Sequence, residues 1–118
     1  LTNKEAKEIY KGIDILIDQL YAGWYGGLAV ELMALGKPVM VYLRESDLKF
    51  LPKEMADDLP FLTINPKSIC DDLRYLLKLD RKELLEISYK SRNFVETWHD
   101  PKKIVKDISL DIKNLFKN

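Results

Sequence analysis

The apolar residues of this chain are grouped in short runs in its first half and spaced at helical intervals in its second half. Three runs, at residues 13–18, 39–43 and 61–64, predict strands, because a parallel strand buried on both faces is apolar along its length. Residues 26–35 lie between the first two runs and predict a helix, which Gly36 ends in a left-handed cap. Strands that alternate with helices predict an α/β fold with a parallel sheet and right-handed crossovers.

Cap signals predict the helices that flank this unit. Asn65 followed by Pro66 is typical of a helix start, as is Asp100 followed by Pro101. Asp80 is followed three residues later by a glutamate, the spacing of a capping box. Helices are therefore expected over residues 3–11, 65–79, 80–98 and from 100 onward, with one or two further helical turns between 44 and 58.

Composition limits the classes of function. The chain has 118 residues, which suits one domain over residues 1–118. Its 19 basic and 19 acidic side chains give no net charge, so a nucleic-acid partner is not expected. The single cysteine, Cys70, excludes an internal disulfide and favours a reducing compartment, and we expect its thiol in the core or half-buried. No apolar run reaches the length of about 18 residues that a membrane span needs, and no spacing indicates a metal site.

A glycine-rich turn lies at the carboxyl end of the first predicted strand, where open α/β sheets bind their ligands. Gly26 and Gly27 directly precede the predicted helix, and without Cβ atoms their backbone can approach a phosphate closely. The alternative is a tight turn that serves packing alone. Glu31 falls one turn into the helix, where its carboxylate can accept hydrogen bonds from a ribose diol. The alternative for Glu31 is a solvated residue that interacts with the helix dipole.

Further polar and aromatic residues near this edge have two readings each. Trp24 and Tyr25 suit either a base or sugar site or an anchor of the loop in the core. Asp18 can bind a ligand hydroxyl or cap the loop, and capping is favoured. Arg44 follows the second strand and is read as an exposed arginine, with a phosphate contact as the alternative. His99, the only histidine, suits a helix C-terminus, and no residue is assigned a catalytic role.

The segment from residue 13 to 42 resembles the donor-binding half of GT-B glycosyltransferases, in particular the retaining, family-4-like enzymes. In that family a hydrophobic strand leads into Glu-Gly-Phe-Gly, four variable residues, a second glutamate, a small-residue helix and Gly-x-Pro-Val. The residues that match are Gly23-Trp24-Tyr25-Gly26 for the turn, Glu31 for the second glutamate, and Ala34, Gly36, Pro38 and Val39 for the helix end and the next strand. Residues 91–100 are similar to the family's C-terminal helices, so the resemblance covers nearly the whole chain.

The resemblance implies a three-layer, Rossmann-like parallel sheet with C-terminal helices, the latter part of a donor domain. An N-terminal acceptor domain and further strands are expected before Leu1. The full-length protein would transfer a sugar from a nucleotide-diphosphate sugar, without a metal or other cofactor, in polysaccharide biosynthesis. It would act in the cytoplasm, at the inner membrane face and in peripheral contact with it. The donor site so implied comprises Asp18, Gly23, Trp24, Tyr25, Gly26, Gly27 and Glu31.

One position departs from the family pattern. The first glutamate of the family lies eight positions before the second, and Gly23 stands there, or Ala22 if one inserted residue is allowed. Asp18 is the nearest acidic residue that could replace it. The departure keeps two other hypotheses open. One is a non-catalytic module of Rossmann-like or flavodoxin-like type, and the other is a degenerate glycosyltransferase domain used for oligomer contacts.

The chain taken by itself is predicted to form a homodimer. In a complete donor domain the strand at residues 13–18 would have neighbours on both sides, so one edge is left unpaired here, and such edges recruit another chain. The last predicted helix adds an apolar stripe, formed by Ile104, Ile108, Ile112 and Leu115. Edge pairing is the favoured route and helix packing the second.

Overall fold

The computed structural model describes residues 1–117 and contains a small open sheet of three parallel strands. The strands are β1 (Leu16–Ile17), β2 (Val39–Val41) and β3 (Leu62–Thr63), in the spatial order β1-β2-β3. Leu16 pairs with Val39 and Met40 pairs with Leu62. The predicted α/β class and parallel sheet are therefore confirmed. The strands are shorter than predicted. At the start of the first predicted strand, the Ile13 N–H donates to the Tyr10 carbonyl at 3.2 Å, at the end of the first helix.

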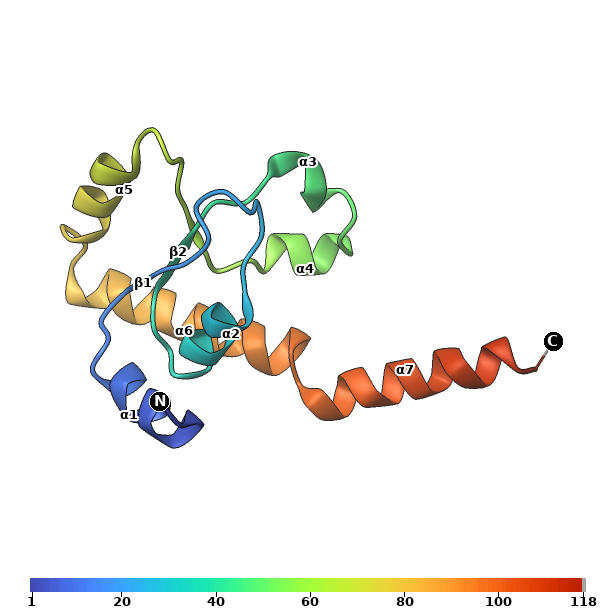
Figure 1. Cartoon of the computed structure of the whole chain (residues 1–118). Coiled ribbons are helices and arrows are strands. Elements are labelled where there is room, and N and C mark those ends of the chain that lie inside the picture. Colours follow the sequence, from blue (N-terminus) through green and yellow to red (C-terminus); the bar gives the residue numbers. More distant parts are fainter. Residues whose placement is uncertain (118) are drawn as a thin grey trace.

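Helices make up most of the chain (Figure 1). They are α1 (Asn3–Lys11), α2 (Gly27–Ala34), α3 (Glu45–Leu48), α4 (Lys53–Asp57), α5 (Ile69–Leu76), α6 (Arg81–Trp98) and α7 (Pro101–Leu115). The long helix α6 runs beneath the sheet and packs against α2, whereas α7 continues away from the body (Figure 1). None of the helices within residues 1–117 is long and apolar enough to span a bilayer.

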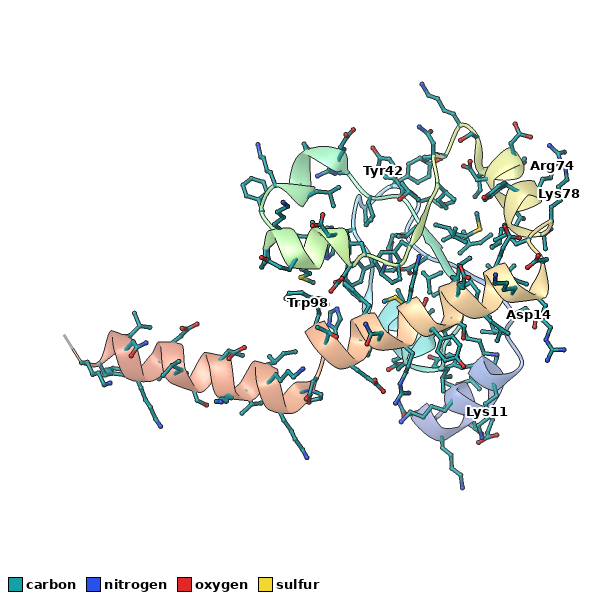
Figure 2. All side chains as sticks on the ribbon, turned by 180° about the vertical axis from the view of Figure 1, so that it is seen from behind. Lys11, Asp14, Tyr42, Arg74, Lys78 and Trp98 are labelled. Atoms are coloured by element: carbon teal, nitrogen blue, oxygen red, sulfur yellow. The ribbon has the colours of Figure 1, made fainter. Side chains whose placement is uncertain are left out.

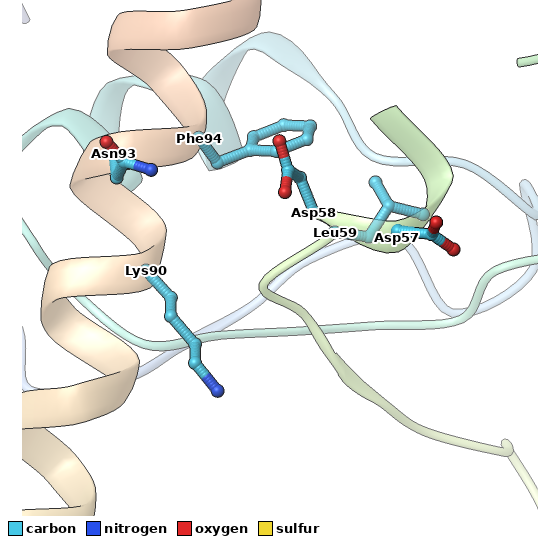
Figure 3. A pocket seen from close by; sticks show the side chains of 6 residues that line it. All are labelled: Asp57, Asp58, Leu59, Lys90, Asn93 and Phe94. Atoms are coloured by element: carbon cyan, nitrogen blue, oxygen red, sulfur yellow. The ribbon is translucent and has the colours of Figure 1, made fainter. Parts of the chain in front are cut away.

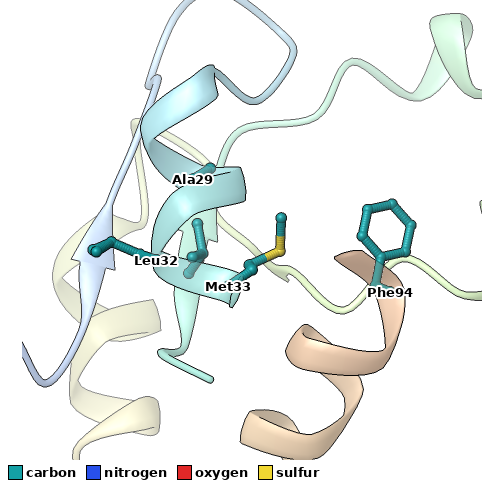
Figure 4. Packing of buried hydrophobic residues seen from close by; sticks show 5 residues of the cluster. Ala29, Leu32, Met33 and Phe94 are labelled. Atoms are coloured by element: carbon teal, nitrogen blue, oxygen red, sulfur yellow. The ribbon is translucent and has the colours of Figure 1, made fainter. Parts of the chain in front are cut away.

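The core consists of two clusters on opposite sides of β2. Val39 packs with Ala29, Leu32 and Met33 of α2 and with Phe94 of α6 (Figure 4). The next strand residue, Met40, belongs to a second cluster, with Ile64 and Leu76 of α5. Successive side chains of a strand point to opposite faces, so a strand covered on both sides reads as a continuous apolar run. The α2 helix is apolar for a related reason, because the sheet and α6 both cover it.

The contact between α2 and α6 is close where α2 ends. Gly36 has φ +71°, as the predicted left-handed cap requires, and an added Cβ would lie 2.6 Å from Oγ of Ser88 on α6. The Arg92 guanidinium on α6 donates to the carbonyl of Ala34. This carbonyl lies at the end of α2, where carbonyl groups have no partner within their own helix. Ser91, also on α6, is buried, and its hydroxyl has no partner within residues 1–117. Small side chains on α6 thus let the two helices approach.

Two predicted helix starts are confirmed and one is wrong. The Asp80 carboxylate accepts the Glu83 N–H at 2.9 Å, and that of Asp100 accepts the Lys102 N–H at 2.9 Å, so α6 and α7 begin as expected. The helix expected at Asn65 begins instead at Ile69, with Ser68 as its N-cap. The Asn65 side chain accepts the backbone N–H two residues later, and that bond closes a turn rather than a helix.

The last helix and the cysteine show what the sequence pattern left open. The predicted apolar stripe is present on α7, but every described residue of this helix is exposed (Figure 2). Leu115, for example, is 76% exposed. The prediction that Cys70 lies in the core or is half-buried is wrong. Cys70 lies on the outer side of α5 and is exposed. The apolar cluster beneath α5 is filled by Leu73 and Leu76 instead.

Candidate functional site

The turn between β1 and α2 is organised by Asp18. This residue follows β1, and its Oδ2 accepts the Gly26 N–H at 2.8 Å. Gly26 is the N-cap of α2 and has no side chain of its own to fill that role. Asp18 therefore caps the loop, as the favoured reading predicted. Its carboxylate also brings a negative charge to the amino end of α2, where the helix dipole stabilises it.

Gly27 is the first residue of α2, and packing does not require a glycine at this position. Its φ is not positive, and apart from its chain neighbours and the backbone of its own helix, no atom lies within 4 Å of the place where a Cβ would be. A larger residue could therefore occupy this position without a clash inside the chain. The backbone here is open to solvent at the amino end of a helix, the arrangement in which a backbone N–H meets an anion.

Gly23 is required for a different reason. Its φ is +80°, and an added Cβ would lie 3.0 Å from Cβ of Arg44 and 3.1 Å from a guanidinium nitrogen. The Arg44 N–H donates to the Gly23 carbonyl at 2.9 Å, and the Arg44 guanidinium pairs with Asp47 at 3.1 Å. Position 23 is where the resembled family has its first glutamate. A glutamate side chain there would be strained by the backbone and would collide with Arg44.

The two aromatic residues of the turn lie in an aromatic cluster that closes the core. The Tyr25 ring is 4.9 Å from that of Trp24 and 4.7 Å from that of Phe61, between ring centroids. Its hydroxyl is hydrogen-bonded to Nε2 of His99 at 3.0 Å. Burial raises the pKa of Tyr25 to about 12 and lowers the pKa of His99. Tyr25 thus anchors the turn to the end of α6, which corresponds to the second of its two predicted readings.

Glu31 lies apart from the turn. Its side chain is exposed and borders a pocket of about 300 Å³ between α1 and α2, together with Lys7, Tyr10 and Leu35. Partial burial, followed by the nearby Glu31 carboxylate, raises the pKa of Tyr10. The structure therefore brings Asp18 and Gly26 together, and it places Glu31 on the side of α2 that faces α1.

Further hollows were not predicted from the sequence, among them one beside α6 and one at the sheet edge. The first, of about 170 Å³, lies between α4 and α6 and is lined by Asp58, Lys90 and Phe94 (Figure 3). Asp58 accepts the Trp98 indole N–H at 2.9 Å, and this hydrogen bond links the end of α4 to α6. The second hollow lies at the carboxyl end of the sheet, where Tyr21 and Tyr42 take part in it. Its signal in the sequence is weak, because each of its residues simply follows a strand.

Known proteins supply no further guide to this site. A comparison with protein-family models, with curated proteins and with solved structures finds no match. Within residues 1–117, no group of three or more His, Cys, Asp or Glu side chains is placed to hold a metal ion. The chemistry must therefore be argued from the sheet edge itself.

Proposed function

We propose that this chain forms part of the donor site of a glycosyltransferase, which moves a sugar from a nucleotide-diphosphate sugar to an acceptor. The sheet is then the latter part of a larger, three-layer donor domain of GT-B type, and a separate domain binds the acceptor. The diphosphate lies at the amino end of α2, where backbone N–H groups and the helix dipole favour negative charge. The chain alone is inactive, because donor and acceptor meet only when two such domains close.

The observation that carries this proposal is the open backbone at Gly27. Packing does not demand a glycine there, yet it stands at the start of α2 and at the carboxyl end of β1. A phosphate approaching this backbone would explain the missing side chain. The Asp18 carboxylate occupies the neighbouring Gly26 N–H, so the diphosphate would use the groups that follow Gly26. Glu31 is exposed on the side of α2 that faces α1, so its carboxylate can accept hydrogen bonds from a ribose diol where the nucleotide extends from the turn toward α1.

Following the resemblance, we further propose that the full-length enzyme works in the cytoplasm, at the inner face of a membrane. Acceptors of such enzymes are lipid-linked or polysaccharide intermediates. No metal or cofactor is part of this proposal, because the backbone N–H groups at the amino end of α2 offset part of the charge of the diphosphate.

Calorimetric titration of the full-length protein with UDP, GDP and ADP tests the donor site. We expect one diphosphate to bind, and Glu31→Ala to weaken it by about 1–3 kcal/mol, the scale for hydrogen bonds to a charged group. Gly27→Val should weaken it more, because the branched side chain would fill the space above the turn. Gly12→Ala is the matched control, since Gly12 has ordinary right-handed dihedrals at the end of α1. Unchanged affinity in both site variants would contradict the assignment.

A second candidate is a non-catalytic binding or oligomerisation module of Rossmann-like or flavodoxin-like type. Gly23 favours it, because the left-handed backbone and the Arg44 contact exclude a glutamate at that position. Without an acidic group there, the stabilisation of positive charge in sugar transfer must come from elsewhere. Failure of all three diphosphates to bind to the full-length protein would favour this candidate.

A further inference from the structure

A pocket of about 510 Å³ lies at the carboxyl end of the sheet, and none of the candidate donor residues lines it. Each strand contributes through residues that follow it. Tyr21 comes after β1, Tyr42 after β2, and Asn65, Pro66 and Lys67 after β3. Open parallel sheets bind ligands at this edge, and the volume suits a small molecule.

Tyr21 and Tyr42 give the pocket two aromatic walls. The Tyr42 N–H donates to the Gln19 carbonyl at 3.1 Å, which ties the end of β2 to the loop that carries Tyr21. Tyr21 is 81% exposed, and Tyr42 is half-buried. Within residues 1–117 neither ring stacks on another aromatic ring, in contrast to Trp24 and Tyr25. The exposed Tyr21 ring therefore offers a face to the C–H face of a sugar ring, with Tyr42 beside it in the lining of the pocket.

The turn after β3 is fixed in place by hydrogen bonds within the chain. The Lys67 N–H donates to Oδ1 of Asn65 at 2.9 Å, and the Ser68 N–H donates to the Asn65 carbonyl at 2.9 Å. Asp72 of α5 locks the turn, because its Oδ2 accepts the Asn65 N–H at 3.2 Å and the Ser68 hydroxyl at 2.9 Å. Within residues 1–117, the Lys67 ammonium forms no ion pair. A ligand would therefore meet a preorganised turn and a lysine that is free to bind it.

The charge of the pocket selects among ligands. Its lining contains one ammonium group, on Lys67, and no carboxylate. The Asp72 carboxylate accepts the two hydrogen bonds that fix the turn and does not line the pocket. An anionic substituent on a ligand gains a charge-assisted hydrogen bond with Lys67, which a neutral sugar cannot form.

We infer that this pocket binds a sugar ring that carries a carboxylate or a phosphate. The ring lies against Tyr21 and Tyr42, the anionic group meets Lys67, and the Asn65 amide binds a ring hydroxyl. The inference goes beyond the proposed donor site and does not depend on it, because no residue of the Gly26–Gly27 turn takes part.

Titration of the protein with glucose 6-phosphate and with glucuronate, followed by NMR shifts, tests this pocket. We expect both to bind, and unsubstituted glucose to bind about tenfold more weakly or worse, because the contact with a charged group is lost. Lys67→Gln should remove most of this preference. Lys53→Gln, at the exposed start of α4, is the matched control and should leave the preference intact. Tyr21→Ala should weaken all the sugars without unfolding the protein, since Tyr21 is largely exposed.

Inorganic phosphate and UDP complete the experiment. Inorganic phosphate that binds as tightly as glucose 6-phosphate would overturn the inference, because the ring would then not be recognised. UDP that shifts the Tyr21, Tyr42 and Lys67 signals more strongly than the sugars would also overturn it and identify a nucleotide pocket. Absence of any shift from glucuronate and glucose 6-phosphate would do the same. The donor site is tested separately. If Gly27→Val leaves the affinity for UDP unchanged, the donor-site proposal fails and the inference about this pocket is not affected.

Discussion

Helices α6 and α7 begin in the same way but have different surroundings. Each starts with an aspartate whose carboxylate accepts a backbone N–H of the first turn, Asp80 for α6 and Asp100 for α7. Yet α6 buries Phe94 to 1% exposure against α2, while every described residue of α7 is exposed. A helix start is encoded locally by caps, whereas burial depends on whether another surface covers the apolar stripe.

Truncation of one apolar residue on each helix should produce very different losses of stability. Phe94→Ala removes a ring that packs against Met33 and Val39, and we expect it to cost about 3–5 kcal/mol. Ile108→Ala on α7 should change stability by less than about 0.5 kcal/mol, because this side chain is 53% exposed. Urea unfolding of both variants measures the difference. A loss at Ile108 as large as that at Phe94 would mean that α7 is covered in solution.

The same contrast explains how much of the fold could be predicted. The capping aspartates and Gly36 act within a few residues, so their positions were correct. Asn65 followed by Pro66 does not begin a helix, because an Asn side chain can close a local turn as well as cap a helix, and here it closes the turn. The Ile13 N–H bonds to the Tyr10 carbonyl rather than within the sheet, and the exposure of Cys70 depends on the orientation of α5. Neither follows from a local pattern.

The candidate site was predictable only in its location. The glycine turn was expected at the carboxyl end of β1, and it lies there, with Asp18 as its cap. Glu31 follows the turn by one helical turn, but the orientation of its side chain is set by α1, so its position beside Tyr10 could not be predicted. The pocket between Tyr21 and Tyr42 depends on the loops of separate strands and carries no motif.

Self-association gives a second way to compare exposed regions. Within residues 1–117, β1 pairs with β2 on one side alone, and we expect the chain to dimerise through its other edge. Ile17→Lys on β1 should abolish the dimer, since a charge on an edge strand opposes pairing. Ile112→Lys on α7 should have the smaller effect. Both residues are partly exposed in the single chain, at 41% and 48%, so the variants are well matched for folding.

Sedimentation over a wide concentration range measures this association. If Ile112→Lys alone produced monomers, α7 rather than the strand edge would be the interface. A wild-type chain that stays monomeric at high concentration would contradict both routes. The edge of β1 would then have to be covered within the chain, with α1 as the nearest element along the sequence.

Acidification should weaken the junction between α6 and α7, and this is the smallest of the effects predicted for stability and association. His99 ends α6, is hydrogen-bonded to the Tyr25 hydroxyl, and has its pKa lowered by burial. The His99 imidazole therefore takes up a proton more readily in the unfolded chain than in the folded chain. The contribution of neutral His99 to stability is full above the ordinary histidine pKa and decreases as the pH falls below it. Solvent screening keeps the effect small, because the ring is only half-buried.

Urea unfolding at pH 7.5 and pH 5.5 isolates this contribution, since His99 is the only histidine in the chain. We expect the wild type to lose more unfolding free energy over this interval than His99→Gln, in which the glutamine can still bond to Tyr25 but does not titrate. A chain shortened after Asp100 should keep the same pH dependence, because Tyr25 and the aromatic cluster hold His99 from the side of α6. If shortening removed the pH dependence, protonation of His99 would affect stability through α7. The exposed helix α7 would then be coupled to the core.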